Sequence, residues 1–234
     1  MQTNSNPKIG IFDSGLGGLS VWLEVIKELP NTSIIYYADS GNCPYGNKSE
    51  AEITRLSKAC TEFLLEQGCE MIIVACNTAT AAAIEILRAT YDVPFVGMEP
   101  AIKPAALQTQ TGNVGVLATK GTLEGRLFNQ TKSRYAQDVQ VHIQIGEGLV
   151  ELVENLEMNT PKAKDLLKQY LQPMLANNVD KIVLGCTHYP FLTPMIQQLV
   201  PKQVTIINPA PAVARQAKKR WLTLNLENQT DTPD

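Results

Sequence analysis

The sequence has no long hydrophobic run and no strongly basic stretch. Its longest apolar runs, such as Met71 to Cys76, are far too short to span a bilayer. The longest basic run is Lys218-Lys219-Arg220, and the formal net charge is -3 with a pI of about 5.5. Nucleic-acid binding needs a surface that neutralises phosphates, so neither nucleic acid nor a membrane is expected as a partner. The polar first eight residues lack the apolar core of a targeting signal, and we expect a cytoplasmic protein that acts on small molecules.

Paired cysteines are also missing. The five cysteines include no Cys-x-x-Cys pair, and an odd count in an intracellular chain favours free thiols over a disulfide framework. The close pair in Cys186-Thr187-His188 offers too few ligands for zinc, so no metal is expected. Cys60, on an apolar helical stripe, and Cys69, beside a helix stop, are interpreted as packing residues, whereas Cys43, in a loop, stays undecided.

Strand-length apolar runs alternate with helical patterns, which is typical of an α/β protein with mostly parallel sheets. Leu19 to Leu29 has helical spacing, and the capping box Ser49 to Glu52 begins a helix that ends at Gly68. The alanine-rich segment 79–89 predicts a third helix. Strands are predicted at residues 8–13, 33–38, 71–75, 94–98, 113–118, 139–145, 181–186 and 204–208.

The order of elements in the first half recurs in the second half. The fold class expected is α/β, with two similar doubly wound βαβ-type domains related by pseudo-twofold symmetry and the active site between them. Residues 1–98 plus 208–222 would form the first domain and 99–207 the second, and the polar tail 223–234 is expected to fray. The third strand of each half ends in a cysteine followed by two polar residues, Cys76-Asn77-Thr78 and Cys186-Thr187-His188. The two cysteines are therefore expected to face each other across one cleft.

Two thiols on opposite sides of a carbon atom can invert it, because one removes a proton while the other delivers one from the far side. A helix N-terminus favours the thiolate, and both cysteines are predicted where a strand leads into a helix. Asp13, at the end of the first strand, and His188 are candidates to exchange a proton with one thiol each or to set its charge. The residues therefore predict inversion at a carbon atom by proton transfer, the chemistry of a racemase.

Other polar residues have simpler interpretations. His142 alternates with Val141 and Ile143 on a strand, so we expect it to face solvent. Glu151 and Glu154, on one predicted helix, are interpreted as a solvated face.

Two cofactor-dependent alternatives stay open. Gly15-Leu16-Gly17-Gly18 follows the first strand and Asp39 ends the second, as in a dinucleotide-binding unit, but the G-x-G-x-x-G spacing is absent and Asp13-Ser14 stands where its first glycine belongs. Pyridoxal phosphate would need a Schiff-base lysine, for which Lys120 is the one suggestive candidate.

Several motifs together resemble the bacterial glutamate racemases of the aspartate/glutamate racemase family. They run in the family's order along the chain: Ile11 to Ser20, Pro44-Tyr45-Gly46, Val74 to Ala79, Glu99 to Ala105, and Leu184 to Pro190. The resemblance implies a two-domain α/β fold that interconverts L- and D-glutamate without cofactor or metal and supplies D-glutamate for peptidoglycan. It also suggests a homodimer.

The resemblance implies a role for each matching residue. Cys76 would abstract the α-proton of D-glutamate and Cys186 that of L-glutamate, assisted by Asp13 and His188, with Glu154 as possible support for the histidine. Substrate-binding groups would be Asp13, Ser14, Tyr45, Gly46, Asn77, Thr78, Thr119, Thr187 and His188. The sequence departs from the family at Gly146-Glu147-Gly148, where many members have Ala-Cys-Pro, and at Asn208-Pro209, where Asp-Ser is usual. A racemase for aspartate or another small amino acid, and a binding protein that leaves glutamate unchanged, are the other open alternatives.

Overall fold

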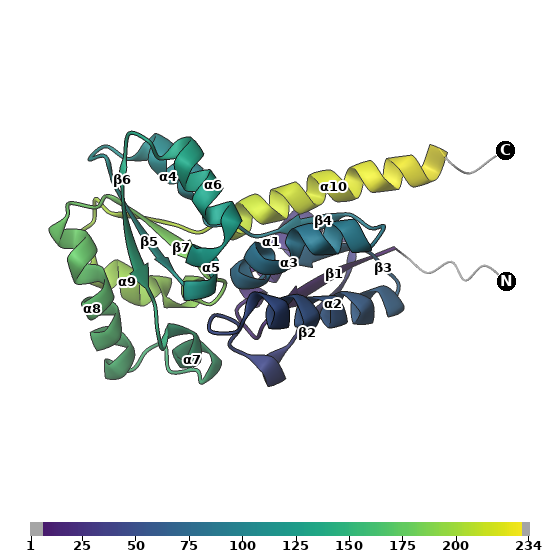
Figure 1. Ribbon diagram of the computed structural model, residues 1–234, viewed down its shortest axis with the longest axis horizontal. Helices are drawn as coiled ribbons and strands as arrows, with labels where there is room; N and C mark the ends of the chain where they lie inside the picture. The colour runs from purple at the N-terminus through teal and green to yellow at the C-terminus, as the bar shows by residue number, and fades with distance from the viewer. Residues whose placement is uncertain (1–6, 231–234) are drawn as a thin grey trace.

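The computed structural model describes residues 7–230, with side chains described through residue 224. It contains two sheets side by side, each with four parallel strands (Figure 1). The first has the order β2-β1-β3-β4 and the second β6-β5-β7-β8, so the same topology occurs twice. The repeat predicted from the sequence, and with it the fold class, is confirmed. The strands are β1 (Lys8–Asp13), β2 (Ser33–Ala38), β3 (Cys69–Val74), β4 (Phe95–Gly97), β5 (Asn113–Ala118), β6 (Gln140–Ile145), β7 (Lys181–Gly185) and β8 (Thr205–Ile207).

Helices cover both faces of the first sheet. On one face, buried side chains of α1 (Leu19–Glu28) and α10 (Ala210–Thr230) pack on β1, β3 and β4. On the other face lie α2 (Glu50–Glu66) and α3 (Asn77–Thr90). The Ser49 hydroxyl accepts a hydrogen bond from the Glu52 amide, so the predicted helix start is confirmed.

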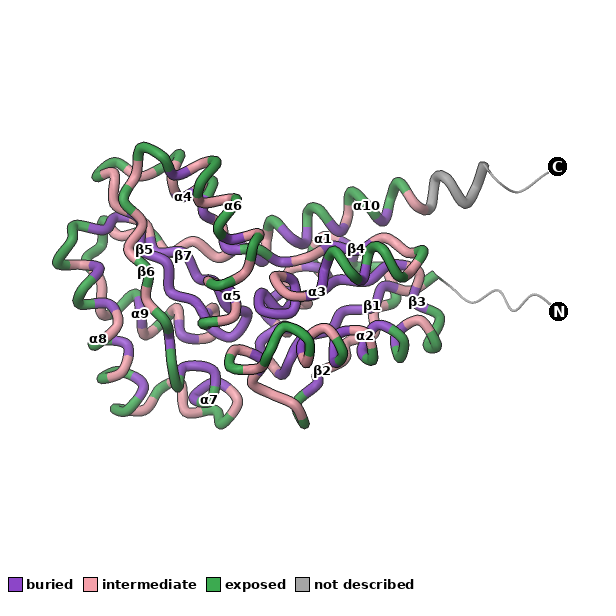
Figure 2. Tube along the Cα trace, in the orientation of Figure 1, coloured by how far each residue is buried: buried purple, intermediate pink, exposed green. Residues whose placement is uncertain are grey.

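The second sheet is enclosed in the same way, with buried cores on both faces (Figure 2). One face carries α4 (Ile102–Gln108) and α6 (Arg126–Tyr135), and the other carries α7 (Leu149–Glu154), α8 (Pro161–Ala176) and α9 (Thr193–Leu199). The short helix α5 (Lys120–Glu124) contacts α3 of the first half. Two 3₁₀ helices, η1 (Ser40–Asn42) and η2 (Tyr189–Leu192), lie in loops.

The chain end and one histidine differ from the sequence expectations. Helix α10 continues to Thr230, where fraying was expected from Thr223. Its apolar side as far as Leu224 packs on the core of the first sheet, and its later residues extend the same helix. The last four residues of the predicted tail lie outside the described range. His142 is half-buried within hydrogen-bond distance (2.9 Å) of Asn113, while Ile143 is 43% exposed. The predicted sidedness was wrong because β6 is an edge strand, where alternation is only weakly enforced.

No helix within residues 7–230 has both the length and the apolar character that crossing a bilayer requires.

Candidate active site

A narrow cavity lies where the carboxyl ends of the two sheets meet. Strand ends or the loops after them in both halves supply its walls, as expected for parallel α/β sheets. Only about 10 Å³ of it can hold the centre of a water molecule, which is room for about one water. Its lining residues are Ser14, Pro44, Tyr45, Gly46, Cys76, Asn77, Thr78, Thr119, Val150, Cys186, Thr187 and His188. The two cysteines predicted to share one cleft therefore line the same cavity, one from each half.

Cys76 follows β3 and forms the N-cap of α3. Its Sγ accepts a hydrogen bond from the Ala79 amide at 3.4 Å and lies 3.9 Å from Ser14 Oγ. Burial, followed by the nearby Asp13 carboxylate, raises the pKa of the Cys76 thiol despite these hydrogen bonds. The helix start favours the thiolate as expected, through the Ala79 amide, but the loss of solvation outweighs this contribution and the net pKa is raised.

Cys186 follows β7 in the second half, in the position that corresponds to Cys76. Its Sγ lies 3.7 Å from His188 Nδ1. A helix follows it as expected, but this is the 3₁₀ helix η2, which begins at Tyr189 after a short loop. Cys186 thus has an imidazole as its polar neighbour, whereas Cys76 has backbone and a hydroxyl.

Buried His188 forms a pair with half-buried Glu154, the last residue of α7. His188 Nε2 and Glu154 Oε1 are 2.5 Å apart, and the same oxygen accepts a hydrogen bond from the Leu16 amide at 2.7 Å. Burial acts to lower the pKa of His188, but contacts with Cys186, Cys43 and Glu154 outweigh it and raise that pKa well above its usual value. The hydrogen bond from His188 lowers the pKa of Glu154. The solvated face expected for Glu154 was wrong, because α7 packs beside η2 and turns this side chain inward, whereas Glu151 is exposed.

Asp13 lies directly beneath the cavity wall at the end of β1. Its Oδ2 accepts hydrogen bonds from the Gly15 and Gly18 amides, and its Oδ1 accepts one from Thr187 Oγ1 at 3.1 Å. Burial raises the pKa of Asp13 although the nearby His188 and these hydrogen bonds act in the opposite direction. Asp13 is therefore held rigidly in electrostatic contact with both Cys76 and His188.

The groups that would bind a dinucleotide or pyridoxal phosphate make other contacts in this structure. The amides of the glycine-rich turn bind Asp13 and Glu154, and the Asp39 carboxylate accepts from Tyr45 Oη at 2.5 Å and from Asn42 at 2.8 Å. Lys120 is exposed and lies 3.8 Å from Glu124. These contacts favour neither a dinucleotide nor a Schiff base.

The remaining predicted binding residues form a polar wall. The hydroxyls of Thr78 and Thr119, one from each half, are 2.8 Å apart, and Thr122, which the sequence did not single out, lies 2.9 Å from Thr119. Asn77 donates its amide hydrogen to the Met98 carbonyl at 3.2 Å, and its buried Oδ1 has no partner among the described residues. The Tyr45 ring lines the cavity while its hydroxyl is bound to Asp39.

Sequence reasoning left Cys43 undecided, and the structure brings it to the site. It is half-buried beside the His188–Glu154 pair. Its position directly before the Pro44-Tyr45-Gly46 motif was a usable signal, since these three residues line the cavity.

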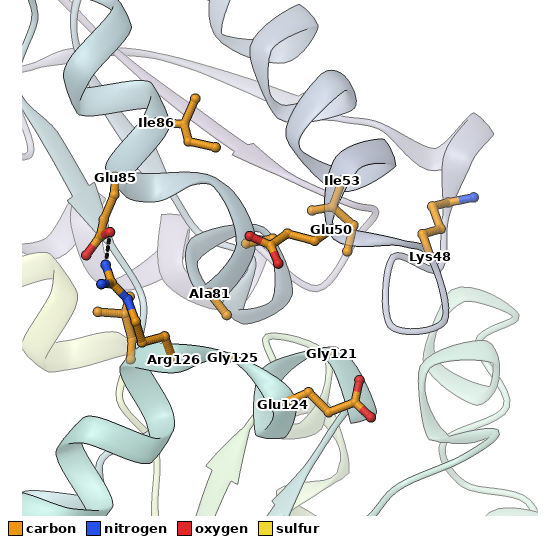
Figure 3. A pocket seen from close by; sticks show the side chains of 12 residues that line it. Lys48, Glu50, Ile53, Ala81, Glu85, Ile86, Gly121, Glu124, Gly125 and Arg126 are labelled. Carbon is orange, nitrogen blue, oxygen red and sulfur yellow. Dashed lines mark hydrogen bonds and ion pairs between the residues drawn. The ribbon is translucent and has the colours of Figure 1, made fainter.

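A larger groove of about 470 Å³ runs between the halves outside this cavity (Figure 3). Its walls come from α2, α3, α5 and α6, with no cysteine or histidine among them. The Glu85–Arg126 ion pair joins α3 to α6 there, but both side chains are more than half exposed, so it contributes at most about 1 kcal/mol. The groove therefore lacks the chemistry of the smaller cavity.

Residues 23–217 match the sequence profile of the Asp/Glu/Hydantoin racemases. The chain belongs to that family. The resemblance inferred from its motifs is thereby confirmed.

Named relatives of this racemase family cover nearly the whole chain. The glutamate racemase of Herpetosiphon aurantiacus is 49% identical over 220 residues, which are 94% of this chain and 87% of that protein. The glutamate racemase of Pseudomonas entomophila is 50% identical over 220 residues, 94% of this chain and 83% of that protein. The similarity therefore extends across both sheets and the cavity between them.

Solved structures of family members share the fold. Escherichia coli glutamate racemase, in complex with L-glutamate and the activator UDP-MurNAc-Ala, has a TM-score of 0.86 and 37% identity, covering 92% of this chain and 82% of that one. Francisella tularensis glutamate racemase with D-glutamate has a TM-score of 0.78 and 29% identity, covering 96% and 82%. The aspartate racemase of Picrophilus torridus, 18% identical with a TM-score of 0.61 over 91% and 93% of the two chains, shares the fold alone.

Proposed function

We propose that this chain interconverts L- and D-glutamate by removing and replacing the proton on Cα, without a cofactor. The observation that carries the proposal is that Cys76 and Cys186, one from each half, line one cavity. The relatives that match most of the chain at about half identity are named glutamate racemases, and two solved relatives hold L- or D-glutamate. The substrate is carried over from them.

The reaction needs one thiolate and one thiol on opposite sides of Cα. The thiolate accepts the α-proton, the electron pair left on carbon is delocalised into the α-carboxylate, and the opposite thiol then donates its proton to the other face. The protonation states of the two sulfurs are exchanged at the end, so the enzyme is ready for the opposite enantiomer. By the family assignment, Cys76 takes the proton of D-glutamate and Cys186 that of L-glutamate.

Each cysteine has a different neighbouring side chain that can help its thiol lose or regain a proton. Asp13 interacts electrostatically with Cys76, and His188 lies 3.7 Å from Cys186. Because Glu154 holds the imidazole by its Nε2, the Nδ1 side of His188 faces the sulfur in a fixed orientation. We assign Asp13 and His188 to move or stabilise the proton of their respective cysteines, with Glu154 orienting the histidine.

The polar wall suits a substrate with two carboxylates and an ammonium group. Asn77 Oδ1 is a buried acceptor with no partner in the part of the chain that the structure describes, which suits the substrate ammonium. Hydroxyls of Ser14, Thr78 and Thr119 and the backbone of Tyr45-Gly46 are donors for the carboxylates, whereas the Thr187 hydroxyl donates to Asp13. The cavity between the halves is narrow, so we infer that the two halves separate to bind glutamate.

The wider biological role follows from the same resemblance. We propose that the D-glutamate formed is used in peptidoglycan biosynthesis, that the protein acts in the cytoplasm, and that it works as a homodimer. We also retain the domain division into residues 1–98 plus 208–222 and residues 99–207.

Circular dichroism of L-glutamate incubated with the protein, without added cofactor, tests the function directly. The signal is expected to decay to zero as the racemate forms. A parallel panel of other L-amino acids, including aspartate, tests the substrate. Faster decay with aspartate would assign the chain to another substrate, and bound glutamate of unchanged chirality would make it a binding protein instead.

A further inference from the structure

Three side chains beside the cavity bring a sulfur, a carboxylate oxygen and an imidazole nitrogen close together, and each of these atoms can bind a metal ion. One atom each from Cys43, Glu154 and His188 lies within 4.8 Å of the other two. They come from segments far apart in the sequence: the loop after η1, the end of α7 and the segment after β7. His188 is buried, whereas Cys43 and Glu154 are half-buried. The cluster is therefore anchored in the protein on one side and open to solvent on the other.

This ligand set matches zinc better than a hard cation. A thiolate, an imidazole and a carboxylate together suit Zn²⁺, whereas Mg²⁺ and Ca²⁺ prefer oxygen ligands alone. In tetrahedral zinc sites the ligand atoms lie about 3.3 to 3.6 Å from one another, given metal–ligand distances of about 2.0 to 2.3 Å. Atoms already within 4.8 Å reach that arrangement with shifts of about an ångström. Water or a small anion from the open side can supply the fourth ligand.

We propose that Cys43, Glu154 and His188 form an inhibitory binding site for Zn²⁺. Inhibition rests on the racemase function proposed above, whereas the binding itself does not. On binding, the thiol proton of Cys43 and the proton on Nε2 of His188 pass to solvent. The Glu154 carboxylate, which is hydrogen-bonded to Nε2 before the metal binds, then coordinates the metal instead. The three side chains then hold one ion.

Metal on Nε2 fixes the state of the other ring nitrogen. His188 then keeps its remaining proton on Nδ1, the atom that lies 3.7 Å from Cys186 Sγ. The imidazolium of the metal-free protein can exchange its Nδ1 proton with Cys186, whereas the metal-bound imidazole cannot take a second proton at Nδ1 and would become an imidazolate if it lost the one it has. Proton transfer through Cys186 stops, and removal of the metal by a chelator restores it. The catalytic reaction itself needs no metal.

The other cysteines outside the catalytic pair lack such partners. Cys60 is buried next to Tyr45, and Cys69 is buried at the start of β3. Within residues 7–224, no other set of three such groups reaches the same proximity. Cys69→Ser is therefore a matched control: it removes a thiol in the same protein, away from the cluster.

The test is titration of the whole protein with Zn²⁺, read out by equilibrium dialysis and by racemisation rate. Wild type is expected to bind one Zn²⁺ at this site, lose activity and recover it with EDTA. Cys43→Ser and Cys43→Ala are expected to weaken Zn²⁺ binding by at least about 10-fold, the lower end even for loss of an outer partner of a metal. Each variant's inhibition is compared with its own metal-free rate, and Cys69→Ser is expected to match wild type.

Cobalt supplies a spectroscopic readout that does not depend on activity. Co²⁺ bound through Cys43 is expected to give a thiolate-to-metal charge-transfer band that disappears in both Cys43 variants and persists in Cys69→Ser. Wild-type zinc affinity in the Cys43 variants would overturn the proposal. A chain without racemase activity that still binds zinc through Cys43 would contradict the proposed function and leave the metal site standing.

Discussion

Thr187 Oγ1 donates a hydrogen bond of 3.1 Å to Asp13 Oδ1, which joins the end of the second half's β7 to the end of the first half's β1. Ser20 Oγ adds a second link by donating to the Thr187 carbonyl at 2.9 Å. Both contacts are buried. The residues around the two thiols are therefore positioned by direct contact between the halves as well as within each half.

Removal of either cavity thiol tests its part in the reaction. Cys76→Ala and Cys186→Ala are each expected to lower turnover by at least about 10²-fold, the lower end for loss of a general acid or base. Circular dichroism of L-glutamate gives the rate, and Cys69→Ser controls for loss of a buried thiol. Near-normal kinetics in either alanine variant would remove that cysteine from the mechanism.

The turn after β1 leaves no room for a side chain at Gly17. A Cβ there would lie 2.3 Å from His188 Nδ1 and 2.6 Å from Thr187 Oγ1, so both groups must move. Because displacements of about 1 Å can cost about 10²-fold in rate, Gly17→Ala is expected to lower kcat by that order. Gly41→Ala, where nothing lies within 4 Å of the added carbon, is the control. Equal racemisation rates for Gly17→Ala and Gly41→Ala would show that the placement of His188 and Thr187 is not critical for the reaction.

Glu154→Gln tests whether the carboxylate orients and charges His188. The variant keeps the side-chain shape but removes the anion at 2.5 Å from Nε2. We expect kcat to fall by at least about 10-fold with a smaller change in KM. A His188 ring that is misoriented or has lost its charge impairs proton transfer at Cys186 more than it impairs substrate binding. Glu151→Gln, on the exposed side of α7, is expected to behave as wild type. A rise in KM with kcat unchanged would instead make Glu154 a substrate-binding residue.

Asp180, far from the cavity, is expected to make the free energy of unfolding depend on pH in the acid range. Burial acts to raise its pKa, but hydrogen bonds from the Gln110 amide and the Thr109 and Thr111 hydroxyls, together with Lys181, outweigh it and hold that pKa below its usual value. A lowered pKa in the folded state means that the carboxylate stabilises the fold above about pH 4. This contribution disappears as the pH falls through the folded pKa.

Urea unfolding checks this prediction. Asp180→Ala is expected to lower the free energy of unfolding at pH 7 by about 1.5 to 3 kcal/mol, as for hydrogen bonds to a charged group. The difference from wild type is expected to shrink in acid. Asp165→Asn, at an exposed position of α8, is expected to stay within about 0.5 kcal/mol of wild type. An unchanged difference at low pH would contradict the assignment to the ionised carboxylate.

Much of the fold was predictable because its signals are local. The bounds of β1, β2 and β5 agree with their apolar runs, and Ser49 marks the start of α2 by its cap. The repeat was visible since each half uses the same order of runs. The orientation of His142 was not predictable, because an edge strand has no second neighbour to fix which side is buried.

The site was predictable where its residues end strands and not where packing decides. Cys76 and Cys186 follow equivalent strands, so their meeting could be inferred from topology. Glu154 and Cys43 reach His188 only through the packing of α7 and of a loop, which no sequence period encodes. The raised pKa of Cys76 was also missed, since the sequence shows the helix start but not the extent of burial.

The central claim is that two thiols act from opposite sides of one carbon, and the hydrogen at Cα of product formed in heavy water tests it most directly. L-glutamate is converted to low extent in D₂O, and both enantiomers are analysed by mass. Donation by a second, solvent-equilibrated thiol predicts that D-glutamate carries deuterium while the remaining L-glutamate is largely unlabelled. D-glutamate that retains the original proton would show that a single base carries it from one face to the other, which contradicts the account.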